Sequence, residues 1–374
     1  MAAVQKVGIV GAGAAGVASA ILLAQGGVEV EVIERHDGPT TLGSGITLQG
    51  NALRILRQLG VWDEVERRGF PFGTLGIRAP GPGAAVLAVL EDMRTGGPDL
   101  PATVGMYRPE LAELMDRKAL DAGVTFRWGR TVKAVEQCGD SVQILTDDGV
   151  AADYDLLIGA DGIHSTVRRL VGIDVEPAPV GMGIWRAFVP RPADVDRTDL
   201  YYGGPCYIAG YCPTGPDTMY CYLVEDAQHR DQSQGAEIMR ELSSAYGGPW
   251  SEIREHLGGD ARINYTHFTQ HLVDGPWNRG KVVLIGDAAH SCPPTIAQGA
   301  AMALEDAAVL AELVLAADQL DAGLWENFSA RRLPRARSVV EASVQLAQWQ
   351  LDHNREADAG ALIATVGQLV AVPA

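Results

Sequence analysis

Three glycines near the start of the chain, Gly11, Gly13 and Gly16, form a G-x-G-x-x-G pattern. The pattern follows a short apolar run at residues 6–10 that predicts a buried strand, and it opens an Ala- and Leu-rich stretch, residues 14–25, that predicts a helix. Glycines at this spacing permit a tight turn and close approach of the backbone to a pyrophosphate, while the helix N-terminus offers free N–H groups to the anion. The residues expected to hold a dinucleotide here are Gly11, Gly13, Ala14, Ala15 and Gly16.

Glu34 ends a second predicted strand, residues 28–33, and lies 23 residues after Gly11. An acid at this place can accept hydrogen bonds from a ribose diol. Arg35 either reaches the adenosine or is a solvated surface charge. This strand–helix–strand unit predicts a dinucleotide but does not distinguish FAD from NAD.

Asp287 follows another short apolar run, residues 281–285, which predicts a buried strand. A loop containing Pro294 then leads to a predicted helix at residues 298–317. Asp287 is well placed to bind a ribityl hydroxyl, and the N-terminus of the helix would stabilise negative charge on a reduced flavin ring. These features favour a flavin as the dinucleotide.

The remaining pattern indicates the elements that must position these residues. Residues 154–160 predict a further buried strand, and residues 50–60 and 109–122 predict helices. Residues 180–225 hold six tyrosines between Gly- and Pro-rich breaks, which predicts an antiparallel sheet. Residues 234–257 and most of 325–372 predict helices.

The predicted fold class is therefore α/β. A Rossmann-like FAD-binding domain with a parallel sheet carries an inserted, mostly antiparallel β-sheet substrate domain and C-terminal helices. We expect the FAD-binding domain to be discontinuous, the substrate-binding domain to interrupt it twice, and a helical segment to follow. The FAD-binding domain is expected at residues 1–72, 104–175 and 275–350. The substrate-binding domain is expected at residues 73–103 and 176–274, and the C-terminal helical segment at residues 351–374.

Composition excludes several classes of protein. The net charge of −17 argues against a nucleic-acid partner, which needs a basic patch. The five cysteines include no C-x-x-C pair, so a metal site, a disulfide scaffold and a dithiol redox centre are not expected. No run of about 18 apolar residues predicts a membrane span. The apolar N-terminal run could imitate a signal peptide, but its glycines fit the phosphate pattern, and we expect a cytoplasmic protein with reduced thiols.

Five segments of the chain resemble those of the class A flavoprotein monooxygenases, the para-hydroxybenzoate hydroxylase family, and occur in that family's order. The segments are residues 11–35, 43–60, 107–115, 155–169 and 280–306. Asp161-Gly162 resembles the family's DG motif and Gly286-Asp287 its GD motif, whereas Arg108 matches an arginine that contacts the FAD. The resulting candidate cofactor-binding residues are Gly11, Gly13, Ala14, Ala15, Gly16, Glu34, Arg35, Ser44, Gly45, Arg108, Val132, Asp161, Gly162, Gly286, Asp287, Gln298, Gly299 and Ala300.

The resemblance implies bound FAD, NADH or NADPH as a transient co-substrate, and O2. It implies hydroxylation of a small aromatic or N-heteroaromatic phenol through a flavin hydroperoxide. The expected oligomeric state, which the resemblance does not decide, is a monomer or a homodimer. The chain departs from the family at Ala297, where many members have glycine, and at Ala301, where many have asparagine. These departures affect the details of flavin contact rather than binding itself.

Tyr211, Tyr222 and Pro294 are the candidate catalytic residues. In the family, the sheet that corresponds to residues 180–225 covers the substrate, and a phenol hydroxyl there could position it; the alternative is packing alone. Pro294 is expected against the flavin ring. Arg186 is either an ion-pair partner or a group facing the site. His290, His164 and Cys292 are expected to be structural, and no general base stands out.

Other classes of function remain open at this stage. A plain NAD-dependent dehydrogenase would leave the Gly286-Asp287 and Asp161-Gly162 segments without a role. A non-catalytic flavin-binding module would contain the same motifs. Within the family, epoxidation or oxidation of a larger natural product is the alternative to hydroxylation of a small phenol.

Overall fold

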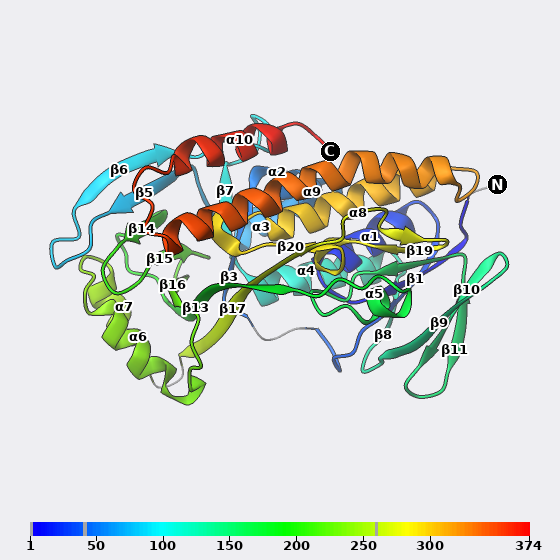
Figure 1. Cartoon of the computed structure of the whole chain (residues 1–374), viewed down its shortest axis with the longest axis horizontal. Coiled ribbons are helices and arrows are strands. Elements are labelled where there is room, and N and C mark those ends of the chain that lie inside the picture. Colours follow the sequence, from blue (N-terminus) through cyan, green and yellow to red (C-terminus); the bar gives the residue numbers. More distant parts are fainter. Residues whose placement is uncertain (1–2, 40–42, 259–260) are drawn as a thin grey trace.

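A parallel β-sheet forms the centre of the half of the molecule that contains the N-terminus (Figure 1). The computed structural model describes residues 3–39, 43–258 and 261–374. The strands of this sheet, in spatial order, are β18 (Asn278–Arg279), β19 (Val282–Leu284), β12 (Leu156–Gly159), β1 (Lys6–Val10), β2 (Glu29–Ile33) and β8 (Thr125–Arg127). All neighbours are parallel except β18 with β19. The predicted Rossmann-like sheet is confirmed.

Helices cover this sheet, whose inner strands are apolar on both faces because both faces are buried. The helices of this half are α1 (Ala14–Gln25), α4 (Arg108–Asp121), α5 (Thr166–Leu170) and α8 (Gly299–Ala316). Helix α1 packs on both α4 and α8, and its small side chains allow this close approach. A separate antiparallel sheet is formed by β9 (Val132–Cys138), β10 (Ser141–Thr146) and β11 (Ala151–Tyr154).

An eight-stranded sheet dominates the other half of the molecule. Its strands, in spatial order, are β20 (His290–Ser291), β17 (Arg262–Leu272), β13 (Ala178–Pro190), β16 (Thr218–Asp226), β15 (Ile208–Pro213), β14 (Thr198–Tyr202), β5 (Thr74–Arg78) and β6 (Val86–Glu91). Only β5 and β14 are parallel neighbours, so the prediction of a mostly antiparallel sheet is confirmed.

Two helices, α6 (Gly235–Ser243) and α7 (Trp250–His256), pack on one face of this sheet over a second apolar core. The single helix predicted over residues 234–257 is wrong in its middle. The turn at residues 244–249 breaks it, because Gly248 adopts a positive φ of 61° and Pro249 follows.

A small sheet and two helices connect the halves near the predicted site. They are β3 (Gly45–Gln49), β4 (Phe70–Phe72) and β7 (Thr103–Tyr107), with α2 (Gly50–Gln58) and α3 (Trp62–Arg68). The domain boundaries stay a prediction. Strands β5 and β6 join the antiparallel sheet as expected for an excursion, whereas β20 joins it from a range assigned to the FAD-binding domain.

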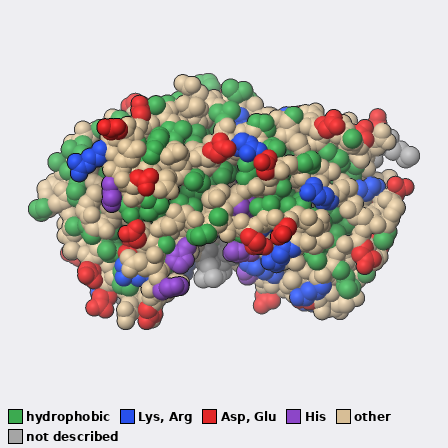
Figure 2. All heavy atoms as spheres, viewed as in Figure 1, with side chains coloured by type: hydrophobic (Ala, Val, Ile, Leu, Met, Phe, Trp, Pro, Cys, Tyr) green, Lys and Arg blue, Asp and Glu red, His purple; other side chains and the backbone are tan. Residues whose placement is uncertain are grey.

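The C-terminal part consists of α9 (Ala322–Leu351) and α10 (Ala359–Ala371), as predicted. Helix α9 runs along both halves, and α10 lies above α2 (Figure 1). Among the residues that the structure describes, no helix is both long and apolar enough to cross a membrane. On the face shown in Figure 2, acidic and basic side chains are interspersed, and the surface is hollowed between the two halves.

Candidate cofactor and substrate site

Three loops meet where β1, β12 and β19 end, because the carboxyl ends of neighbouring parallel strands share one edge of the sheet. A Cβ added to Gly11 would lie 2.4 Å from the carbonyl oxygen of Ala160, and φ of Gly11 is +106°, so only glycine fits. A Cβ added to Gly286 would lie 2.9 Å from Cβ of Ala15. The glycine-rich loop therefore contacts both the DG and the GD segments, which lie far from it in sequence.

The N-terminus of α1 is open for an anion. Gly13 is its N-cap, no side chain caps the helix, and its first turn contains no acid. A Cβ added to Gly13 would meet no atom within 4 Å. Backbone N–H groups that lack partners and face free space fit a pyrophosphate, so the residues present suit FAD at this end.

Glu34 directly follows β2 and accepts hydrogen bonds from two backbone N–H groups, those of Ala12 at 2.8 Å and His36 at 2.9 Å. These bonds fix the carboxylate beside the glycine-rich loop, where the sequence predicts a ribose. Arg35 is exposed, and Val132 is buried at the start of β9. Their contacts with the cofactor stay predictions.

Asp116 on α4 is a second carboxyl in this neighbourhood that sequence reasoning did not identify. It is 6% exposed, and its Oδ1 atom has no hydrogen-bond partner. Burial raises the pKa of Asp116 to about 7, and the negative charge of Glu34 contributes. A buried acid on a helix gives no sequence signal that separates it from a surface acid.

The carboxylate of Asp161 is engaged within the protein. It accepts hydrogen bonds from the backbone N–H groups of Thr166 at 2.6 Å and Val167 at 3.1 Å, at the start of α5. Its side chain thus orders the DG segment through the helix N-terminus. Gly162 follows with a φ of +82° and open space around it, and contact of this segment with the cofactor stays a prediction.

Arg168 ties the DG segment to the GD segment. Its guanidinium donates to the carbonyl of Ala288 at 2.8 Å and to that of Ile163 at 2.9 Å. It also contacts Nε2 of His271 at 3.0 Å. Burial, with the charge of Arg168, lowers the pKa of His271 to about 4, so the ring is neutral near pH 7 and accepts at Nε2. His271 Nδ1 then donates to Ser291 Oγ at 2.8 Å.

Asp287 lies in the short turn Gly286–Ala288 that follows β19. Its side chain is accessible to solvent, yet burial is the largest cause of the upward shift of its pKa, whereas His290 and Arg108 lower it. A carboxyl that neighbouring protein atoms desolvate and that solvent still reaches is available to a ligand. Arg108 begins α4, and its N–H donates to the carbonyl of Ser44 at 3.2 Å, which brings a fourth predicted segment to the same place.

The segment expected beneath the flavin ring is held by side-chain amides. Asn51 Nδ2 donates to Gln298 Oε1 at 3.0 Å, and Gln49 Nε2 donates to the carbonyl of Ile296 at 3.0 Å. Gln298 caps α8 without a side-chain bond to the helix, so the N–H groups of Gly299 and Ala300 remain available. Gln49 and Asn51 lie in the 43–60 stretch, but their roles were not predicted.

The segment between β19 and α8 contains three residues with structural roles or backbone strain. His290 is buried, and its Nε2 binds Asp306 at 2.7 Å. Burial raises the pKa of Cys292 to about 12, so the thiol is not a nucleophile. Ala297 has a φ of +54°, which explains why a glycine would suit this position. Pro294 is exposed at the start of the preceding turn.

Alternate residues of β15 and β16 form the face on which substrate contacts are predicted. Tyr220 and Tyr222 lie on one face with ring centroids 5.5 Å apart, and the Tyr220 hydroxyl contacts Thr47 Oγ1 at 2.9 Å. Arg186 on β13 is paired in register with Tyr222. Burial raises the pKa of both tyrosines, so both hydroxyls remain protonated.

The expectation for Tyr211 is wrong. Its side chain points to the opposite face of the sheet, is 1% exposed, and donates to Asp199 Oδ2 at 2.8 Å within the second apolar core. Side chains alternate along a strand, so the neighbouring Cys212 faces the site side instead. Cys212 Sγ lies 3.7 Å from Thr47 Oγ1.

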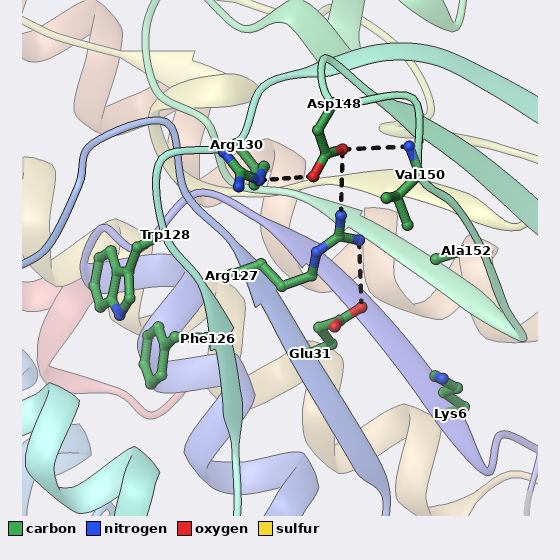
Figure 3. A pocket seen from close by; sticks show the side chains of 9 residues that line it. All are labelled: Lys6, Glu31, Phe126, Arg127, Trp128, Arg130, Asp148, Val150 and Ala152. Atoms are coloured by element: carbon green, nitrogen blue, oxygen red, sulfur yellow. Dashed lines mark hydrogen bonds and ion pairs between the residues drawn. The ribbon is translucent and has the colours of Figure 1, made fainter.

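A hollow of about 600 Å³ lies apart from this site, beside β8 and the sheet of β9 to β11 (Figure 3). Phe126 and Trp128 stack at its side, with centroids 4.9 Å apart. Arg127 pairs with both Glu31 and Asp148. The charges in the hollow are thus satisfied within the protein. Among the described residues, no cluster of possible metal ligands occurs.

Comparison with known proteins agrees with this geometry. The model of the family described as FAD binding domain matches residues 4–343. A putative FAD-dependent monooxygenase, YetM of Bacillus subtilis (strain 168), is 31% identical over 352 residues, with 92% of this chain and 93% of that protein covered. The 3-amino-4-hydroxybenzoate 2-monooxygenase of Streptomyces cremeus is 29% identical, with 92% and 87% covered.

A solved structure shares the fold. The crystal structure of Klebsiella pneumoniae HpxO complexed with FAD and uric acid has a TM-score of 0.81 and 23% sequence identity. The match covers 98% of this chain and 92% of that one.

Proposed function

The chain belongs to the FAD-binding-domain family of flavin-dependent monooxygenases, and from this premise we propose that it hydroxylates a small aromatic or heteroaromatic acid with NAD(P)H and O2. When bound, FAD supplies the electron transfer from NAD(P)H to O2. The protein has to orient the substrate, exclude water and place positive potential near the reacting atoms.

The environment of the Arg186 guanidinium supports an acidic substrate. This guanidinium donates to Thr266 Oγ1 at 2.8 Å, and burial lowers its pKa. The other groups that act on its charge are Tyr220, Arg108 and Tyr222, and none of these is a carboxylate. Arg186 is half-buried, and no ion pair joins it to a carboxylate among the residues that the structure describes. A partly desolvated guanidinium of this kind is available to bind an anionic ligand.

Tyr220 and Tyr222 would bind the same anion as hydrogen-bond donors. Because burial raises the pKa of each hydroxyl, neither tyrosine acts as a general base near neutral pH. The nearby charge of Arg186 would instead lower the pKa of a bound phenol and favour its phenolate, the more nucleophilic form. This arrangement favours a substrate with a carboxylate or an acidic phenol over a neutral aromatic.

The test compares matched pairs of substrates that differ only in charge, such as 3-amino-4-hydroxybenzoate against its amide and a hydroxynicotinate against its amide. We expect the acids to stimulate NAD(P)H oxidation and to yield products one oxygen atom heavier by mass spectrometry. Arg186→Gln should raise KM for the acid by about tenfold or more, the value of a charge-assisted hydrogen bond, and leave the amide unaffected. Arg191→Gln, directly after the end of β13 and bound to the carbonyl of Pro216, is the matched control.

Equal turnover of acids and amides, or an unchanged KM in Arg186→Gln, would contradict the acidic-substrate proposal. Turnover of only larger natural products would favour the alternative substrate class. The same assay run with NADH and with NADPH identifies the co-substrate. We propose a cytoplasmic monomer or homodimer, which light scattering after size exclusion and cell fractionation test.

A further inference from the structure

We propose that the C-terminal helix α10 forms part of the cofactor site. Arg335 couples the packing of α10 to the positions of the two segments that are expected to hold the flavin. The inference rests on the FAD site proposed above. It concerns a part of the chain in which the sequence shows no motif for chemistry.

Arg335 binds the end of α10. Its guanidinium donates to the carbonyl oxygens of Leu369 at 2.8 Å, Val370 at 3.3 Å and Val372 at 2.6 Å. The last carbonyls of a helix lack partners within the helix and carry partial negative charge, so a guanidinium satisfies both needs. Arg54 of α2 donates to the adjacent carbonyl of Ala371 at 3.3 Å.

The same guanidinium binds a buried acid on α8. Arg335 Nε lies 2.7 Å from Glu305 Oε2, and Nη2 lies 3.1 Å from Oε1. Arg332, one turn earlier on α9, binds Glu305 at 2.9 Å and Asp306 at 2.7 Å. Glu305, Asp306 and Arg332 are all 1% exposed or less. Ion pairs this deeply buried tolerate little displacement, because an unpaired charge in the interior is strongly unfavourable.

From these two acids the network reaches both cofactor segments. Asp306 Oδ2 accepts from the N–H of Gly286 at 2.8 Å, directly before Asp287. Glu305 Oε1 accepts from Asn51 Nδ2 at 3.2 Å, and the same Nδ2 donates to Gln298 Oε1 at 3.0 Å. One chain of bonds thus joins the end of α10 to the loop expected at the ribityl chain and to the cap of α8.

An apolar contact supports the same coupling. Val366 and Val370 of α10 belong to one buried cluster with Ile296 and Met302, and Cys292 packs against it. Ile296 and Cys292 lie in the loop between the GD segment and α8. The cluster also contains Val339, Ala342 and Leu346 of α9, which packs directly on this loop. Helix α10 and the loop therefore share one apolar core, while Arg335 links them through the charged network.

The test measures FAD affinity in Arg335→Gln and in its matched control, Arg331→Gln. Arg331 lies on the same helix and donates to the carbonyl of Ala374, but its acid is the exposed Glu312 rather than Glu305. Apoprotein is titrated with FAD, and the dissociation constant is read from quenching of flavin fluorescence. We expect Arg335→Gln to weaken binding by about tenfold and Arg331→Gln by less than about twofold, a coupling of usual size for linked sites. Arg335→Lys, which retains the charge, should recover part of the loss.

Hydrogen exchange on the unmodified protein gives a second readout that does not depend on a variant. Coupling is reciprocal, so FAD should slow amide exchange in the last turns of α10. Equal FAD affinities of the two glutamine variants, or exchange in α10 that FAD leaves unchanged, would overturn the inference. If the unmodified protein takes up no FAD, the proposed function itself fails, which is a distinct result.

Discussion

Gly45 leaves the space that the ring of Tyr220 occupies. A Cβ added to Gly45 would lie 1.9 Å from Cδ1 of Tyr220, far inside contact distance. The role of Gly45 in cofactor binding stays a prediction, whereas its close approach to Tyr220 of β16 is observed. The absence of its side chain lets β3 and β16 approach each other and places the Tyr220 hydroxyl against Thr47.

Gly45→Ala should therefore displace Tyr220 and impair substrate binding more than folding. We expect KM for the substrate to rise by about tenfold, because a hydrogen-bonding group leaves its position. Steady-state NAD(P)H oxidation measures it. Gly73→Ala is the control, since a Cβ there meets no atom within 4 Å. Equal kinetics in the two variants would show that Tyr220 does not depend on Gly45.

Gly13→Ala should separate cofactor binding from folding. The added methyl meets no protein atom, and Ala at this N-cap costs about 1 kcal/mol or less. It would nevertheless occupy the approach of the pyrophosphate, so we expect FAD affinity to fall by at least about tenfold. Fluorescence titration and thermal melting of the apoprotein measure the two effects. Gly83→Ala, also in open space, should change neither. Unchanged FAD affinity in Gly13→Ala would place the pyrophosphate elsewhere.

Ala297→Gly should not destabilise the protein. The left-handed backbone at Ala297 costs about 1 kcal/mol for a residue with a Cβ, and this relief offsets the greater freedom of glycine in the unfolded chain. Ala301→Gly, within α8, should cost about 1 kcal/mol or more. Thermal melting compares them, and similar losses in both variants would mean that Ala297 is not strained.

Asp116→Asn should stabilise the protein, and more so as the pH rises. Burial raises the folded-state pKa of Asp116 to about 7, above the usual 3.8, so the unfolded chain releases this proton first. The contribution of Asp116 to the free energy of unfolding is at its maximum below about pH 3.8 and decreases as the pH rises towards 7. The total decrease is at most about 4 kcal/mol. Asparagine removes this dependence.

Melting temperatures of Asp116→Asn and the unmodified protein should therefore diverge between about pH 4 and about pH 7. Asp121→Asn, exposed on the same helix, is the control and should show a difference that does not grow with pH. A constant gap for Asp116→Asn would mean that its carboxyl ionises normally.

The sequence predicts the Rossmann-like half well because each of its signals is local. The G-x-G-x-x-G pattern and the apolar runs before Asp161 and Asp287 all depend on neighbouring residues. Parallel strands then bring the loops together without further information, because their carboxyl ends share one edge.

The substrate side was less predictable because both faces of its sheet are covered. Tyr211 and Tyr222 belong to similar aromatic strands, yet Tyr211 faces the second apolar core and Tyr222 lies on the opposite face beside Tyr220. The alternation of side chains assigns residues to two faces of a strand. It does not identify the face that packs on a core and the face that meets a ligand when both faces are apolar. The sequence does not single out Thr47, Gln49 or Asn51. Their roles depend on hydrogen bonds to residues that are distant in sequence, and no local pattern indicates these partners.

The short pairing of β17 with β20 makes the cofactor half and the substrate sheet continuous. His271 and Leu272 pair with Ser291 and His290, and the side-chain bond from His271 to Ser291 reinforces this seam. A hinge that opened the two halves here would have to break the hydrogen bonds between β17 and β20. This side of the molecule is therefore held rigid. Any relative motion of the two halves would therefore have to pivot away from this seam.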